Sequence, residues 1–399
     1  MSSSNSTSQA ATFALGAVTG VIVCWILPKL QGLKAKKGTS LTEKYARPNI
    51  LTLQPYRCAR DDYSTGLLLD ANENTLGPSL STPSSNILER YPSPYQIPLK
   101  KKLSKIRSIS VENIFVGVGS DEAIDMLYRI FCVPGVSNVI TTPPTYGMYK
   151  VCAVTNDVKI KEVPLDSSYN LRVPEMLRAV DSNTRIIWIC SPGNPTSHSI
   201  SETQIRLIAS NFPGIVVVDE AYVDFAVDGS MCKLLKEFDN VVVLQTLSKA
   251  FGLAGIRCGF ALASEEIIEL MNRVKAPYNL NKLSSIIAQD ALDNYPSLQE
   301  KIKSVIKERE RVAKVLDSKD YVVRVQPSDA NFLLFQLTSK AKEVYQSMAD
   351  DFAVVTRYRG TEKHCNECIR VTVGRIEENE EFLKALDGAW EKVNGSVSL

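Results

Sequence analysis

Side chains suited to acid–base and anion-binding chemistry recur along the middle of this 399-residue chain, each shortly after a run of apolar residues. The first is the loop Gly119–Ala123, whose backbone N–H groups at the start of an expected helix suit a phosphate. Later loops add the ring of Tyr146, the amide of Asn194, the carboxylate of Asp219, the phenol of Tyr222, the amine of Lys249 and the guanidinium of Arg257. Such a set could hold an anion, orient a ring and supply a nucleophilic amine.

The apolar runs before these loops predict the buried strands of a largely parallel sheet, because they are rich in β-branched residues and show no polar alternation. They cover residues 113–118, 139–142, 185–190, 215–218, 241–245 and 259–263. Ligands of open α/β sheets bind beyond the carboxyl ends of the strands, so the loops should meet around one site. Each loop alone is weak evidence, since turns and helix caps use the same residues. Together they fit pyridoxal phosphate, a cofactor that the protein must hold, tune and provide with an amine.

A second domain is expected in the carboxyl-terminal part of the chain. Beyond residue 285, long charged helices at about residues 296–316 and 377–393 flank shorter strand-like runs, which is typical of an α+β fold. The sequence thus predicts an extension (1–40), an arm that docks on the small domain (41–75), a large cofactor-binding domain (76–285) and the small domain (286–399).

The composition argues against several classes of function. With 46 lysines and arginines against 44 aspartates and glutamates, the chain offers no general electrostatic case for binding nucleic acid. It has two histidines, His198 and His364, so a His-rich metal site is excluded and no metal is expected. Its nine cysteines, an odd number, are typical of a reducing compartment. Cys365 and Cys368 form a CxxC motif without a second pair, so we interpret them as free thiols in a loop.

The amino-terminal extension contains an uncharged apolar stretch over residues 11–27, followed by four lysines between residues 29 and 37. This length is at the short end of what crosses a bilayer as a helix, and the lysines suit the cytosolic side. One interpretation is therefore a single-pass membrane anchor, and the other is a disordered or cryptic extension. In either case we expect the catalytic body to be cytoplasmic.

The motifs of the body resemble those of fold-type I pyridoxal-phosphate enzymes, and more closely those of the histidinol-phosphate aminotransferases. The resemblance runs from about Gln54 to Val373. It implies an α/β fold in which a mostly parallel seven-stranded sheet lies between helices, with a smaller α+β domain. The motifs that carry the resemblance are residues 69–74, 90–92, 119–125, 144–149, 246–251, 255–259 and 368–374.

The resemblance also implies a role for each loop residue. Lys249 would bind the cofactor covalently and then move the substrate proton, while Asp219 would pair with the pyridine nitrogen. Asn194 and Tyr222 would bond to the ring oxygen, and Tyr146 would stack on the ring. The catalytic residues would thus be Lys249, Asp219 and Tyr222. The residues expected to hold the cofactor phosphate are Ser120, Asp121, Thr246, Ser248 and Arg257.

Substrate choice is expected to depend on arginines of the second domain. By the resemblance, Arg357 and Arg370 would bind the substrate phosphate, and in the second half-reaction a carboxylate of glutamate or 2-oxoglutarate. Tyr56 matches a tyrosine near the substrate, and Asn72 lies in a motif that lines the site. Tyr91 matches a tyrosine that reaches the cofactor phosphate from a neighbouring subunit, which implies a homodimer; a turn tyrosine is the alternative.

The activity implied is the exchange of L-histidinol phosphate and 2-oxoglutarate for imidazole-acetol phosphate and L-glutamate, in histidine biosynthesis. An aminotransferase of the same fold that acts on phenylalanine or tyrosine is the alternative, and a membrane-tethered scaffold without catalysis is disfavoured by the complete set of loop residues. Ser197 stands where the family usually has glycine, and Arg359 is interpreted as a solvated surface arginine.

Overall fold

The computed structural model describes residues 39–58, 67, 69–81 and 87–395. The chain divides into two units, residues 1–44 and residues 45–399, and the first is described only over residues 39–44, at the start of helix α2 (Leu41–Tyr45). The apolar stretch 11–27, for which the sequence suggests an anchor, lies outside the described residues. Within the described part, no helix combines the length and apolar character that a membrane crossing requires.

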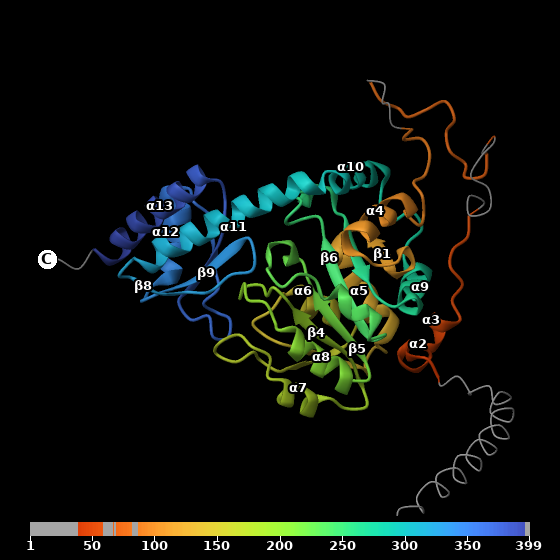
Figure 1. Cartoon of the computed structure of the whole chain (residues 1–399), viewed down its shortest axis with the longest axis horizontal. Helices are drawn as coiled ribbons and strands as arrows, with labels where there is room; N and C mark the ends of the chain where they lie inside the picture. The colour runs from red at the N-terminus through yellow and green to blue at the C-terminus, as the bar shows by residue number, and fades with distance from the viewer. Residues whose placement is uncertain (1–38, 59–66, 68, 82–86, 396–399) are drawn as a thin grey trace, which may run out of the picture. The chain divides into compact units, whose positions relative to one another are not determined.

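A seven-stranded sheet organises the larger part of the second unit (Figure 1). Its strands follow the order β1-β7-β6-β5-β4-β2-β3, in which β7 is antiparallel to both of its neighbours and the other neighbouring pairs are parallel. The expected mostly parallel sheet is therefore confirmed. The strands are β1 (Ile114–Gly117), β2 (Asn138–Thr141), β3 (Lys159–Glu162), β4 (Thr184–Cys190), β5 (Ile215–Asp219), β6 (Val241–Thr246) and β7 (Gly259–Leu262).

Helices surround this sheet, and we call the sheet with these helices the large lobe (residues 97–293) (Figure 1). The central strands β5 and β6 are buried along their whole length, because their β-branched side chains face helices on both sides. The helices are α4 (Ile97–Arg107), α5 (Gly119–Phe131), α6 (Met148–Thr155), α7 (Val173–Ala179), α8 (Glu202–Asn211), α9 (Glu265–Val274) and α10 (Lys282–Asp293), with the 3₁₀ turns η2 (Val111–Asn113), η3 (Val223–Phe225), η4 (Met231–Lys236) and η5 (Ala254–Ile256).

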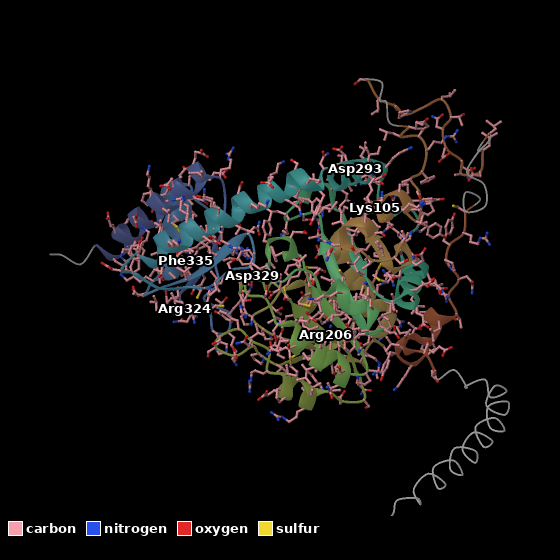
Figure 2. The ribbon with its side chains drawn as sticks, in the orientation of Figure 1. Lys105, Arg206, Asp293, Arg324, Asp329 and Phe335 are labelled. Atoms are coloured by element: carbon pink, nitrogen blue, oxygen red, sulfur yellow. The ribbon has the colours of Figure 1, made fainter. Side chains whose placement is uncertain are left out.

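The second sheet belongs to a small lobe (residues 295–394), which begins with the 23-residue helix α11 (Tyr295–Asp317). Figure 1 shows α11 running from the end of α10 to α12 and α13. The sheet has the antiparallel order β10-β11-β9-β8 and a core of its own that includes Phe335, labelled in Figure 2. The remaining elements are β8 (Val322–Val325), β9 (Phe332–Leu337), α12 (Ala341–Phe352), β10 (Arg357–Tyr358), β11 (Cys368–Thr372) and α13 (Ile376–Asn394).

The two lobes are joined by hydrogen bonds around Asp329, which precedes β9 and is labelled in Figure 2. The backbone N–H of Asp329 donates to the carbonyl of Ser197 at 2.8 Å, and the N–H of Ser199 donates to Asp329 Oδ2 at 3.1 Å. Ser197 has a φ of 58°, in the left-handed region that favours glycine. A glycine, which the resemblance expects at this position, would adopt this conformation without strain.

The start of the arm contacts the large lobe, whereas the sequence prediction docks residues 41–75 on the small domain. The short helix α3 (Pro48–Leu51) buries Ile50, and the N–H of Arg47 donates to the carbonyl of Ile130 in α5 at 2.9 Å. At the other end of α3, the guanidinium of Arg273 in α9 donates to the carbonyl of Leu51 at 3.0 Å. These bonds satisfy terminal backbone groups of a helix too short to satisfy them itself.

Candidate active site

One cavity of about 530 Å³ gathers the loop residues that the sequence analysis singled out. It lies beyond the carboxyl ends of β4, β5 and β6, where the loops from the large lobe meet β10 and β11 of the small lobe. This is the location expected for a ligand of a parallel sheet. The predicted residues that line it are Ser120, Asp121, Tyr146, Asn194, Asp219, Tyr222, Thr246, Ser248, Lys249, Arg257, Arg357 and Arg370.

One end of the cavity has the form of a phosphate cradle. Helix α5 begins at Gly119, whose N–H donates to the carbonyl of Arg257 at 3.1 Å and whose φ is +72°. A Cβ on Gly259 would lie 2.3 Å from the backbone nitrogen of Ser120, so only glycine allows this close approach. The guanidinium of Arg257 reaches Ser248 Oγ at 3.4 Å. Backbone N–H groups at a helix start, a hydroxyl and an arginine together match what a phosphate needs.

Asp219, at the end of β5, is a fully buried carboxylate held by a phenol. Tyr149 donates a hydrogen bond to Asp219 Oδ2 at 2.6 Å, and its ring stacks on Trp188 with centroids 4.8 Å apart. Burial raises the pKa of Asp219 to about 6, although the bond from Tyr149 lowers it. Sequence reasoning gave Tyr149 no role, yet it closes the motif 144–149 that also contains Tyr146.

Lys249 lines the cavity, with its Nζ 5.4 Å from the centre of the Tyr222 ring. Burial, and then the positive charge of Arg370, lower the pKa of this lysine, which favours a neutral amine. Beside it, Asn194 Nδ2 donates to the Tyr222 hydroxyl at 3.5 Å, and Asn194 Oδ1 accepts from Arg370 at 2.5 Å. The amine, the amide, the phenol and the guanidinium therefore converge on the same space.

Tyr146 and Asp121 form the wall beside the cradle. The hydroxyl of Tyr146 donates to Asp121 Oδ1 at 3.1 Å, and the other carboxylate oxygen lies 3.4 Å from the guanidinium of Arg257. Thr246 donates to Ser248 Oγ at 2.9 Å and so orients that hydroxyl. These bonds fix side chains that a bound ring and phosphate would contact.

The small lobe contributes arginines to the cavity, and we call the part that they line its anion end. Arg357 on β10 pairs in register with Arg370 on β11, so the two side chains lie on the same face of the sheet. Arg359 lines the same cavity, with 16% of its side chain exposed, and its Nε is 3.0 Å from Glu362 Oε1. The interpretation of Arg359 as a solvated surface residue is therefore wrong, because the extension of β10 turns it inward.

Three predicted site residues do not line this cavity. Asn72 and Tyr91 line a separate cavity of about 630 Å³, where the Tyr91 ring stacks on Tyr278 with centroids 4.7 Å apart. Tyr56 is 64% exposed. The sequence analysis gave no role to Glu73, which lies beside Asn72 in the motif 69–74. Its carboxylate accepts a hydrogen bond from the N–H of Tyr91 at 2.7 Å and thus positions that tyrosine.

The described residues contain no group of three or more histidine, cysteine, aspartate or glutamate side chains that could hold a metal ion. Cys365 and Cys368 are both buried free thiols.

Comparison with known proteins agrees with this geometry. Residues 66–386 match the family described as aminotransferase class I and II. A histidinol-phosphate aminotransferase of Candida maltosa is 41% identical over 87% of this chain and 98% of its own length. A histidinol-phosphate aminotransferase of Cytophaga hutchinsonii is 43% identical over 85% of this chain and 97% of its own length.

Solved structures give the same fold. The histidinol-phosphate aminotransferase of Clostridium acetobutylicum superposes with a TM-score of 0.70 at 21% identity, over 76% of this chain and 92% of that one. The histidinol-phosphate aminotransferase of Sinorhizobium meliloti, in complex with pyridoxal-5'-phosphate, superposes with a TM-score of 0.71 at 22% identity, over 81% of this chain and 90% of that one. The chain therefore has the fold-type I architecture and belongs to the class I and II aminotransferases. Within that class, its relatives at 41–43% identity place it in the histidinol-phosphate aminotransferase family.

The cradle generates a first prediction. Gly259→Ala should lower the free energy of unfolding by about 1–3 kcal/mol and weaken cofactor binding, because the new methyl group overlaps the Ser120 backbone. Gly255→Ala is the matched control, since a Cβ there meets nothing within 4 Å. Thermal unfolding and cofactor titration of both variants are the measurements. Equal behaviour of the two would show that the close approach is not required.

A second prediction concerns the phenol on Asp219. Tyr149→Phe should destabilise the cofactor-free protein by about 1–3 kcal/mol at neutral pH, because a buried carboxylate loses its hydrogen bond. The pKa of Asp219 should rise further above its present value of about 6, since this bond lowers it. Stability should therefore recover as the pH falls and the carboxylate is protonated. Unfolding free energies at pH 5 and pH 8 test this, and a loss that is the same at both pH values would contradict it.

Proposed function

We propose that this aminotransferase exchanges L-histidinol phosphate and 2-oxoglutarate for imidazole-acetol phosphate and L-glutamate, a step of histidine biosynthesis. The observation that carries this proposal is the placing of Lys249 and the pair Arg357 and Arg370 in one cavity. An amine that can move a proton then stands beside cations that can hold an acidic substrate. The names of the relatives at 41–43% identity support the same substrate.

The cofactor of this family is pyridoxal 5'-phosphate, and the described residues fit it. A cradle closed to any side chain at Gly259 suits its phosphate, and the buried carboxylate of Asp219 suits a protonated ring nitrogen. When bound, the cofactor supplies an electron-accepting ring that stabilises the negative charge left on the substrate Cα. Its phosphate would be held by Ser120, Asp121, Thr246, Ser248, Arg257 and, from a neighbouring subunit, Tyr91.

Each side chain near the ring has a distinct task in this proposal. Lys249 takes the proton from the substrate Cα at its Nζ and later returns it, which its lowered pKa favours. Asp219 would hold a proton on the ring nitrogen by charge pairing. Asn194 and Tyr222 would donate hydrogen bonds to the ring oxygen, and Tyr146 would pack on the ring face.

The anion end of the cavity serves both half-reactions. Arg357 and Arg370 bind the phosphate of histidinol phosphate and then a carboxylate of glutamate or 2-oxoglutarate. Planar guanidinium groups suit both anions, because each anion presents paired oxygens. We keep Tyr56 and Asn72 as substrate-binding residues in this proposal, and they would act from segments outside the described cavity lining.

We also propose that the enzyme acts as a homodimer. Tyr91 is 51% exposed and Glu73 fixes its backbone, as suits a residue offered to another subunit. The cytoplasmic location of the body remains a proposal of the same kind. So do the domain limits at residues 76–285 and 286–399, although the limit at residue 285 falls within α10, which belongs to the large lobe.

The substrate assignment predicts the outcome of a half-reaction. The full-length enzyme loaded with cofactor should lose its visible absorbance rapidly with L-histidinol phosphate, and slowly or not at all with L-phenylalanine, in the absence of keto acid. The reason is that phenylalanine offers Arg357 and Arg370 only a singly charged carboxylate, whereas histidinol phosphate offers a phosphate with about 1.5 to 2 negative charges. Equal or faster bleaching by phenylalanine would instead assign the enzyme to aromatic amino acids.

The role of Lys249 gives a further prediction. Lys249→Ala should remove the visible band of the lysine-bound cofactor and abolish turnover, while the far-ultraviolet circular dichroism stays that of the wild type. Lys363→Ala, a change at an exposed lysine, is the control and should retain both band and turnover. Turnover that survives in Lys249→Ala would refute the mechanism.

A further inference from the structure

Arg359 contributes a guanidinium to the cavity that neither the motifs nor the comparisons assign. It follows β10, and its backbone N–H donates to the carbonyl of Cys368 at 2.9 Å, which continues the pairing of β10 with β11. Residues two apart along an extended segment point to the same side. Arg359 therefore faces the same way as Arg357, toward Arg370 and the cavity.

Three guanidinium groups on one side of a small sheet repel one another. Like charges placed directly opposite across strands are destabilising, and Arg357 is directly opposite Arg370. Arg359 adds to this repulsion, since its charge and that of Arg357 both lower the pKa of Arg370, after burial. The two carboxylates that line the cavity, Asp121 and Asp219, lie at its cofactor end and have partners there.

Glu362 offsets part of this charge from behind. Its Oε1 lies 3.0 Å from Arg359 Nε, and its N–H donates to the carbonyl of Arg359 at 3.0 Å, so a turn fixes the pair. Among the described residues, Glu362 is not part of the cavity lining. Three positive charges with one negative charge behind them leave an excess of two at the anion end.

We propose that Arg359 is a specificity residue which, with Arg357 and Arg370, makes the anion site prefer a phosphate dianion over a carboxylate. The inference rests on the proposed function, which it deepens. A phosphate monoester carries about 1.5 to 2 negative charges at pH 7 and three acceptor oxygens, whereas a carboxylate carries one charge and two oxygens. The third guanidinium thus has a charge and an oxygen to bind in the phosphate group of histidinol phosphate that a single carboxylate group of glutamate lacks.

The test uses the full-length holoenzyme, in which bound cofactor fills the phosphate cradle. Inorganic phosphate, titrated by calorimetry, is the first probe, and the half-reactions with L-histidinol phosphate and L-glutamate are the second. Arg359→Gln should lower the affinity for inorganic phosphate and for histidinol phosphate by about tenfold or more, as expected for the loss of a charged hydrogen bond. The affinity for glutamate should fall by about threefold or less. Arg359→Lys should recover part of the phosphate affinity.

The control is Lys363→Gln, which removes a positive charge from the same loop at an exposed position and should change neither affinity. Unchanged phosphate binding in Arg359→Gln, or an equal loss for phosphate and glutamate, would overturn the proposal. If Arg359→Gln does not fold, Arg359→Lys carries the test, because it keeps the charge and loses the planar fork. Wild-type enzyme that binds phosphate through Arg359 but does not react with histidinol phosphate would refute the proposed function alone.

Discussion

The hydrogen bond from Arg370 to Asn194 Oδ1, 2.5 Å long, is the contact on which the site depends. Asn194 belongs to the loop after β4 in the large lobe, and Arg370 belongs to β11 in the small lobe. The bond therefore joins the groups that would hold a cofactor ring to the arginines that would hold a substrate. Because Asn194 is buried and also donates a hydrogen bond to Tyr222, a change in the position of β11 would alter the contacts of the Tyr222 hydroxyl.

Burial acts in opposite directions on the two central ionisable groups. It lowers the pKa of Lys249 and raises that of Asp219, because removal from water disfavours the charged form of each. The lysine is thereby brought toward the neutral amine that the proposed proton transfer requires. For the carboxylate, the bond from Tyr149 opposes the rise, so a pKa of about 6 leaves Asp219 mostly ionised at neutral pH.

The parts of the site that could be predicted from sequence share one property: they follow apolar, β-branched runs. Such runs give buried parallel strands, and the carboxyl ends of parallel strands lie at the same edge of a sheet. The sequence pattern alone therefore predicts that Lys249 and Asp219 lie close together. The strands β3 and β10 lack that signal, because β3 is charged and partly exposed and β10 is two residues long. The prediction for Arg359 was wrong for this reason. The direction of its side chain is set by β10, and no hydrophobic pattern in the sequence predicts that strand. The position of Tyr91 depends on contacts with distant residues such as Glu73, which local sequence does not report.

Ser197 shows why a departure from the family pattern can leave the chemistry untouched. A non-glycine residue in the left-handed region costs roughly 1–2 kcal/mol, and a hydrogen bond returns about 0.5–1.5 kcal/mol. The Ser197 hydroxyl lies 2.6 Å from the carbonyl of Thr196 and 3.2 Å from that of Pro327 in the small lobe, so it can offset much of the strain. When this hydroxyl donates to the carbonyl of Pro327, it makes a bond between the lobes that glycine could not make. The substitution thus acts at the junction of the lobes, while Asn194, three residues earlier, keeps its bond to Arg370.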